Sequence, residues 1–150
     1  MENYLSEVHP DQLDSPFTPE SQEICAIVPL RGSTNSIDFS ERLVKKSMQT
    51  LQESKYLNRI FVATDSAELA DMANNMGAEV PFLRSPELST QGVRVNDVLS
   101  VFLTKLEGTG YYPEIVVPID VTYPFRPPNL VDDLINHCIA EGLDTVIAGV

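Results

Sequence analysis

The chain has 150 residues, the size of a single domain, and 43% of them are hydrophobic, which is enough for a core and argues against wholesale disorder. The net charge of −12 argues against nucleic acid or an anionic membrane surface as a partner, although clustered arginines can still bind a small anion. No apolar run approaches the roughly 20 residues of a membrane span, and the acidic N-terminus lacks a signal-peptide pattern, so we expect a cytoplasmic protein.

The first expected unit is a flexible acidic tail over residues 1–22, which contain three prolines and no sustained hydrophobic period. From residue 23 onward, strand and helix patterns alternate. In chain order the expected elements are a strand at 24–30, a helix at 41–54, a strand at 60–63, a helix at 67–76, a strand at 80–83, a helix at 95–106, a strand at 114–119, a helix at 129–140 and a strand at 145–150. This alternation predicts a three-layer α/β/α domain over 23–150, with a mostly parallel sheet covered by helices on both faces.

The same patterns predict which side chains are buried. Val95 is expected on the inner face of its helix. Cys25 and Cys138 fall in a strand and a helix without the spacing of metal ligands, so we expect both to be buried and reduced, with a disulfide or a metal pair as the alternative.

The expected strand at 145–150 has no helix after it in this chain. A buried parallel strand needs a covering layer on each face of its sheet. We therefore expect residues 23–150 to be the N-terminal portion of a larger domain. The alternative is a complete short protein whose sheet edge is covered by a partner chain.

Four arginines lie in or beside the loops of this expected fold. Arg31 and Arg126 follow strands directly, Arg84 follows the short third strand, and Arg94 lies in the next loop. Ligands of open α/β sheets bind at the carboxyl ends of the strands, and the guanidinium group suits phosphate and carboxylate. The arginines therefore predict a local anion site, with pairing of each to a surface acid as the alternative.

The loop at 31–36 follows the first strand with a glycine and small polar residues. Backbone N–H groups in such loops can point at phosphate oxygens. The loop has neither a Walker lysine nor a GxGxxG pattern, so it is not a P-loop or a dinucleotide fingerprint.

Five segments carry a more specific signal through their order along the chain. They are Val-Pro-Leu-Arg-Gly-Ser-Thr-Asn at 28–35, Ala-Thr-Asp at 63–65, Gly-Ala-Glu-Val-Pro-Phe-Leu-Arg-Ser-Pro-Glu-Leu at 77–88, Asp-Val-Thr-Tyr-Pro-Phe-Arg at 120–126 and Asp-Thr-Val-Ile-Ala-Gly-Val at 144–150. Together they resemble the acylneuraminate cytidylyltransferases, the family that activates sialic acids and related acidic sugars. The segment at 77–88 is the most specific of the five.

The resemblance implies a nucleotide-diphospho-sugar transferase-like, Rossmann-like fold and a reaction. The hydroxyl of an acidic sugar attacks the α-phosphate of CTP and pyrophosphate leaves, with Mg²⁺ as the cofactor. The family also implies a possible homodimer, formed largely by later segments.

The resemblance also implies roles for individual residues. Arg31 would be catalytic, holding the triphosphate and stabilising the transition state. The residues implied in nucleotide binding are Gly32, Ser33, Thr34, Asn35, Arg84 and Arg94. The residues implied in sugar binding are Asp120, Thr122 and Arg126, and Asp120 is also the candidate Mg²⁺ ligand.

The sequence departs from the family pattern in its phosphate loop. Asn35 stands where the family has a lysine, and Ser40 and Glu41 stand where it has Lys-Asn. Loss of positive charge beside a triphosphate weakens its binding or the stabilisation of the transition state. Two functions therefore stay open: a divergent cytidylyltransferase, or a catalytically inactive relative that binds a nucleotide or a partner chain. A related nucleotidyl- or glycosyltransferase of changed specificity is a third.

Overall fold

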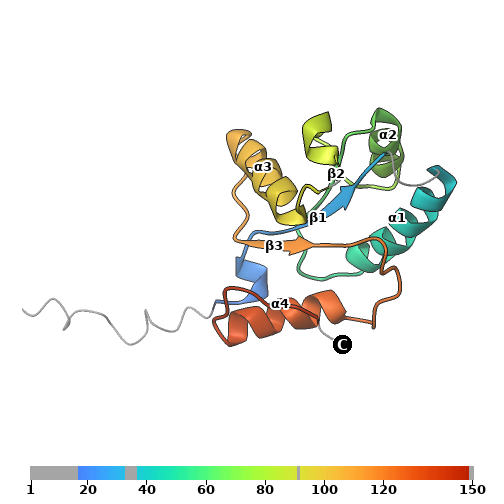
Figure 1. Cartoon of the computed structure of the whole chain (residues 1–150). Coiled ribbons are helices and arrows are strands. Elements are labelled where there is room, and N and C mark those ends of the chain that lie inside the picture. The colour runs from blue at the N-terminus through green and yellow to red at the C-terminus, as the bar shows by residue number, and fades with distance from the viewer. Residues whose placement is uncertain (1–16, 33–36, 91, 149–150) are drawn as a thin grey trace, which may run out of the picture.

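A computed structural model describes residues 17–32, 37–90 and 92–148 (Figure 1). Three parallel strands form one sheet in the order β2-β1-β3: β1 spans Ile24–Leu30, β2 spans Arg59–Thr64 and β3 spans Ile115–Pro118. The central strand pairs on both sides, with Cys25 level with Arg59 and with Val116. The prediction of a parallel sheet is confirmed.

Helices connect and cover these strands. They are α1 at Ile37–Gln52, α2 at Ala67–Asn75, α3 at Val95–Gly108 and α4 at Leu130–Ala140, with short 3₁₀ turns η2 at Pro19–Ser21 and η3 at Pro86–Ser89. α2 begins where the Ser66 side chain accepts the Leu69 N–H, and it ends before Gly77, whose φ of 95° suits glycine. None of these helices, in the part of the chain that is described, is long and apolar enough to cross a membrane.

Alternate residues of β1 face opposite sides of the sheet and build two cores. Ile24, Ala26, Val28 and Leu30 pack with apolar residues of α1, α2 and α4. Cys25 and Ile27 pack on the other side with Phe61 and Ala63 of β2 and three residues of α3, Leu99, Phe102 and Leu106. The predicted three-layer α/β/α arrangement is therefore confirmed, with α3 alone on one face (Figure 1).

A buried carboxylate holds α4 against the turn that follows α1. Asp132, in the first turn of α4, is 7% exposed. Its side chain accepts the hydroxyl of Ser54 and, at 3.0 Å, the backbone N–H of Lys55. The two contacts join segments that are far apart in the sequence.

Replacing Asp132 with alanine is expected to lower the free energy of unfolding by about 2 kcal/mol, because buried donors lose a charged acceptor. Asp133 is the matched control, since it lies in the same helical turn but is exposed. Urea denaturation of both alanine variants measures the difference. Equal losses in the two variants would contradict a specific role for Asp132.

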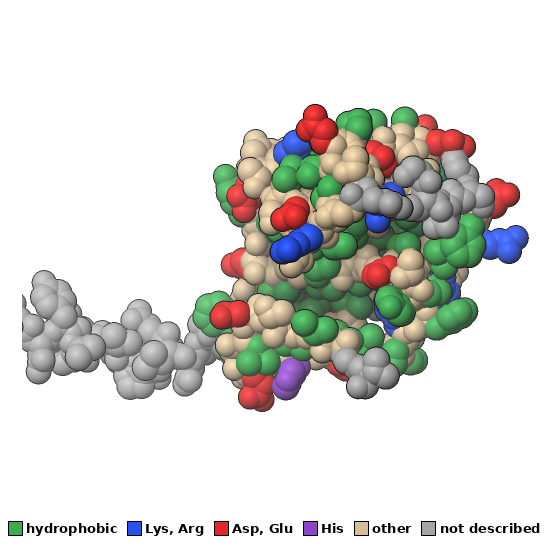
Figure 2. Space-filling model, in the orientation of Figure 1, with side chains coloured by type: hydrophobic (Ala, Val, Ile, Leu, Met, Phe, Trp, Pro, Cys, Tyr) green, Lys and Arg blue, Asp and Glu red, His purple; other side chains and the backbone are tan. Residues whose placement is uncertain are grey.

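Two predicted strands are wrong. Residues 80–83 form no strand, because Pro81 has no N–H to donate, and only an isolated bridge joins Glu79 to Phe61. After α4 the chain turns at Gly142, and the segment 145–148 pairs with no strand; residues 149–150 lie outside the described part. Within the described residues the outer edge of β3 is thus unpaired, and Figure 2 shows hydrophobic side chains in the hollow between β3 and α4.

Other predictions differ in detail. Val95 is 57% exposed, because it begins its helix beyond the core. Cys25 is fully buried and burial raises the pKa of its thiol to about 12, which confirms the prediction for it, whereas Cys138 is only half-buried; both are free thiols. The first helix starts at Ile37, four residues before the expected position. Of the expected tail, 1–16 lie outside the described residues.

Candidate functional site

The register of β1 and β2 brings two sequence segments together at the carboxyl edge of the sheet. Leu30 is level with Thr64, so the residues that follow them, Arg31 and Asp65, leave the sheet side by side. The N–H of Gly32 donates to Oδ1 of Asp65 at 2.9 Å. This is the edge at which ligands of open α/β sheets bind.

Glycine is required at position 32 by close approach. A Cβ placed on Gly32 would lie 2.7 Å from the Cβ of Ser66, the residue that caps α2. Contacts that short do not occur between real side chains, so a larger residue would push the loop away from α2. Glycine at position 32 therefore lets the backbone after β1 pack directly against the start of α2.

Arg84 is buried at the same edge, with 7% of its surface exposed. Its N–H donates to the carbonyl of Thr64 at 2.7 Å, and its Nε donates to Oγ of Ser89 at 3.1 Å. Its Nη2 is buried and has no hydrogen-bond partner among the residues that the structure describes. A buried donor without an acceptor is costly, so this atom marks a place for a ligand oxygen or nitrogen.

The charges around Arg84 favour an anion there. Burial lowers the pKa of the Arg84 guanidinium, the charge of Asp65 raises it, and the like charge of Arg31 lowers it again. Arg31 is half-buried and close enough to repel Arg84. An anion bound between the two groups would relieve this repulsion.

Asp65 is held as a carboxylate in this arrangement. Burial alone would raise its pKa. Hydrogen bonds from the N–H of Gly32 and the hydroxyl of Ser89 act against burial, as do the N–H of Asp65 itself and the charge of Arg84, so the pKa lies below the usual value for aspartate.

Because the pKa of Asp65 is lowered in the folded protein, its contribution to stability is present above the unfolded pKa of about 3.9 and is lost as the pH falls through the lower folded value. Wild type is therefore expected to lose more unfolding free energy than Asp65→Asn between about pH 5 and pH 3. Denaturation at each pH measures the difference, with Asp71→Asn, an exposed change on α2, as a control for the loss of one carboxylate. Parallel curves for wild type and Asp65→Asn would count against the lowered pKa.

The residues after β3 form a turn whose hydrogen bonds converge on Asp120. Thr122 donates its N–H and its hydroxyl to Oδ1 of Asp120, at 2.9 and 2.7 Å. Arg126 donates to the carbonyl of Asp120 and, at 3.2 Å, to Oγ of Ser47 in α1. Burial lowers the pKa of Arg126, and the charge of Asp120 raises it. Of the three residues named in the sequence analysis for this segment, Asp120 thus contacts both of the others.

The other expected site residues are placed as follows. Arg31, Gly32 and Arg84 meet at the edge just described. Arg94 is exposed at the start of α3, and Ser33, Thr34 and Asn35 lie outside the described residues. Sequence reasoning marked the segment 63–65 but assigned no role to Asp65 itself, and it assigned none to Ser89, whose bond to Arg84 no local pattern shows.

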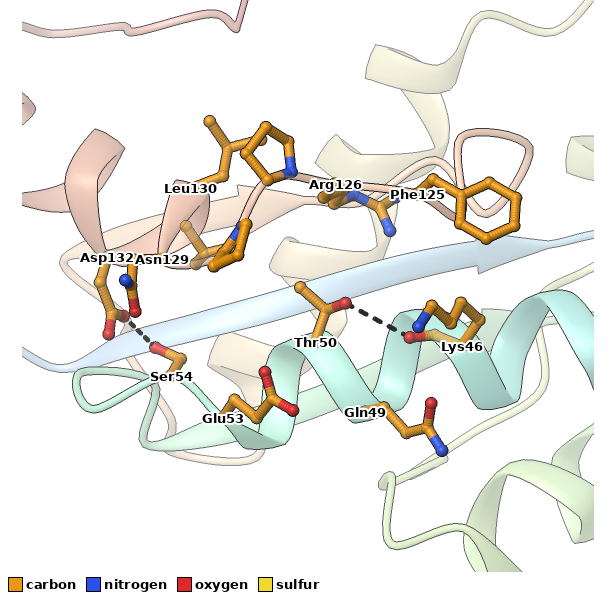
Figure 3. Close-up of a pocket in the computed structure, with 13 residues that line it drawn as sticks. Lys46, Gln49, Thr50, Glu53, Ser54, Phe125, Arg126, Asn129, Leu130 and Asp132 are labelled. Carbon is orange, nitrogen blue, oxygen red and sulfur yellow. Dashed lines mark hydrogen bonds between the residues drawn. The ribbon is translucent and has the colours of Figure 1, made fainter.

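A cavity of about 280 Å³ lies elsewhere, between α1 and the segment 125–132 (Figure 3). Lys46 and Gln49 line it from α1, Glu53 from the turn that follows α1, and Arg126 from the facing segment. Its lining includes none of Arg31, Gly32, Asp65 or Arg84. It lies along a helix and not at the strand ends, so we place the candidate site at the carboxyl edge.

Comparison with known proteins decides the family. The sequence pattern of the family described as cytidylyltransferase matches residues 38–147, which is more than half of the chain. The chain belongs to the cytidylyltransferase family. A similar curated protein in that group is the CMP-N,N'-diacetyllegionaminic acid synthase of Legionella pneumophila, 29% identical over 115 residues, which cover 72% of this chain and 50% of that protein.

A solved structure supports the cytidylyltransferase fold. A CMP:2-keto-3-deoxy-manno-octonic acid synthetase, complexed with CTP, superposes with a TM-score of 0.64 at 13% identity. The match covers 81% of this chain and 49% of that one. The chain therefore spans about half the length of the cytidylyltransferase relatives that it matches.

The described side chains form no preformed cluster for the Mg²⁺ that the family implies. Within residues 17–32, 37–90 and 92–148 there is no group of three or more His, Cys, Asp or Glu that could hold a metal ion. Asp120 offers a single carboxylate, one oxygen of which already accepts two hydrogen bonds from Thr122. We therefore derive no step through the metal.

Proposed function

We propose that the protein is a nucleotidyltransferase that transfers CMP from CTP to an acidic sugar, a sialic acid or a related nonulosonic acid, with release of pyrophosphate. The observation that carries the proposal is the buried Arg84, whose Nη2 has no acceptor among the described residues, beside Arg31 in a chain of net charge −12. Two adjacent guanidinium groups in so acidic a chain favour a polyphosphate ligand. Membership of the family and the relatives that act on acidic sugars support the same substrate class.

In this proposal Arg31 binds the triphosphate and stabilises the charge that develops as pyrophosphate leaves. The bond between the α-phosphorus and its bridging oxygen breaks, a bond from the sugar hydroxyl oxygen forms, and the hydroxyl proton is released. Arg84 donates through Nη2 to the bound nucleotide. The loop residues Gly32, Ser33, Thr34 and Asn35, together with Arg94, complete the nucleotide side.

The sugar side of the proposed site is the turn after β3. Asp120 and Thr122 are exposed there, where hydroxyl and amide groups of a sugar could reach them. Arg126 is half-buried and already donates to Ser47 and to the Asp120 carbonyl. Binding of a sugar carboxylate by Arg126 would require exchange of these contacts, so we assign it first to shaping the turn.

Incubation of the protein with CTP, Mg²⁺ and a panel of nonulosonic acids tests the proposed reaction. We expect sugar-dependent release of pyrophosphate and a CMP-sugar product detectable by mass spectrometry. Arg31→Ala is expected to reduce the rate by about 100- to 1,000-fold, the effect of removing one donor to a developing charge. Absence of pyrophosphate with every sugar, from a protein that binds CTP, would reject the enzyme.

A catalytically inactive nucleotide- or partner-binding protein is the second candidate. The observation that favours it is Asn35 at the position of the family's phosphate-loop lysine. Calorimetry with CTP separates the two: micromolar affinity without turnover supports the binding module, and turnover rejects it. No affinity for CTP would leave only a partner-binding role.

A further inference from the structure

We infer that Asp65 is a positioning residue that couples the phosphate side of the site, at Arg31 and Gly32, to the nucleotide side, at Arg84 and Ser89, so that both sides bind CTP as one unit. The inference rests on the proposed function and gives a role to Asp65, which lies in the segment 63–65 and to which the sequence analysis assigned none.

The first half of the coupling is a backbone contact. Oδ1 of Asp65 accepts the N–H of Gly32 at 2.9 Å, although the two residues lie 33 positions apart in the sequence. Gly32 is also packed against Ser66, where it leaves no room for a Cβ. The loop that carries Arg31 is therefore fixed to the residue that ends β2.

The second half runs through a serine. Ser89 connects Asp65 to Arg84: its hydroxyl helps to lower the pKa of the Asp65 carboxyl, and its oxygen accepts Nε of Arg84 at 3.1 Å. The backbone of Arg84 is tied to Thr64, the neighbour of Asp65. The backbone of Arg84 and its Nε are therefore both held in place near the end of the strand. The buried Nη2 has no partner among the described residues and is available to a ligand.

An acid beside a triphosphate needs a physical reason, because its charge repels the ligand. Oδ1 of Asp65 accepts the N–H of Gly32, and Ser89 and the N–H of Asp65 itself also lower the pKa of the carboxyl, so groups of the protein already stabilise its charge. Its charge also offsets the repulsion between the two arginines before the ligand binds. The role that fits these contacts is to hold two binding groups at a fixed separation.

Fixed separation has a measurable consequence. Two groups held together bind the two ends of one ligand with a high effective concentration, and this advantage is lost when the groups move independently. Loss of Asp65 should therefore weaken binding of CTP more than binding of cytidine or inorganic triphosphate alone. General damage to the fold would weaken all three.

The hydrogen bond is tested first, without any ligand, by NMR of the ¹⁵N-labelled chain. The amide proton of Gly32 is expected to shift with pH as the Asp65 carboxyl titrates, with a midpoint below the usual value for aspartate, and Asp65→Asn should abolish the shift. A Gly32 amide that ignores pH while Asp65 titrates would overturn the coupling.

Calorimetry then compares wild type with Asp65→Ala, Asp65→Asn and Ser89→Ala. We expect Asp65→Ala to bind CTP at least tenfold more weakly, with cytidine and triphosphate changed by no more than about twofold. Asp65→Asn keeps the shape of the side chain, and its amide oxygen can still accept the N–H of Gly32, so its loss of CTP affinity should be smaller. If the alanine variant does not fold, the asparagine variant takes its place in the comparison. Ser89→Ala removes only the contact that connects Asp65 to Arg84, so its loss of CTP affinity should match that of Asp65→Asn.

The outcomes separate the two proposals. Suppose that wild type binds CTP. If Asp65→Ala then binds CTP equally well, or loses affinity for all three ligands alike, the coupling is overturned and the proposed function is left intact. Wild type that binds no CTP overturns the proposed function, and the coupling falls with it.

Discussion

Replacing Arg84 with methionine is expected to lower the affinity for CTP about 100-fold, or about 2.7 kcal/mol, while the free energy of unfolding stays within about 1 kcal/mol of wild type. The functional loss follows from the proposed contact of Nη2 with the nucleotide. The small change in stability follows from burial: the guanidinium is 7% exposed and one of its nitrogens has no partner among the described residues. Methionine removes that cost and also removes the bond to Ser89.

Two further variants make the Arg84 result specific. Arg84→Lys keeps the charge but loses the planar fork, so its affinity is expected to lie between those of wild type and methionine. Arg42→Met removes an exposed arginine of α1 and should leave affinity and stability unchanged. Calorimetry with CTP and urea denaturation measure both quantities. Wild-type affinity in Arg84→Met would remove the main support for the proposed function.

The layers of the fold could be predicted from the sequence, because they depend on the local periodicity of hydrophobic residues. Alternation along 24–30 and helical spacing elsewhere identify the buried faces without any knowledge of contacts. The failures lie where periodicity is weakest. Residues 80–83 are apolar but contain Pro81, and residues 145–148 form no ladder beside β3.

The site was only partly predictable, for a different reason. Position after a strand identifies Arg31 and Asp65 as edge residues, and the register of β1 and β2 then brings them together. No local pattern reveals that the Arg84 guanidinium is buried with an unused donor, or that Arg126 donates to Ser47, because these depend on packing between distant segments. A family resemblance gives such residues a role, but only the packing shows which of their donors are still available.

Two arginines at opposite ends of β2 illustrate the point. Arg59, at the start of the strand, is paired with Glu79 through two hydrogen bonds of 2.7 and 2.8 Å and stacks on the ring of Tyr111 at 4.4 Å. Arg84, bonded to the strand's last residue, has no such pairing at Nη2 with any residue of the described ranges. The sheet therefore has a structural arginine at its amino edge and an available one at its carboxyl edge, where ligands bind.

The largest effect on stability is expected at Phe61, in the middle of β2. Its side chain is fully buried and contacts the rings of Phe102, at 6.0 Å between centroids, and Tyr111, at 5.6 Å, both edge to face. It thereby joins β2 to the helix that covers that face of the sheet alone, α3, through Phe102. Phe61→Ala is expected to cost about 3–5 kcal/mol, from lost burial and the cavity that remains.

A loss of that size is a large share of the roughly 5–15 kcal/mol by which a domain is stable, so Phe61→Ala should be partly unfolded near 37 °C. Phe61→Leu refills most of the space and should lose less. Phe17→Ala is the matched control, since Phe17 is 78% exposed and the same atoms are removed without a cavity. Thermal unfolding, monitored by circular dichroism, ranks the three variants by stability. A loss below about 1 kcal/mol in Phe61→Ala would mean that α3 does not cover this face of the sheet. The carboxyl edge, with Arg31, Asp65 and Arg84, would then lack a covering helix on that face.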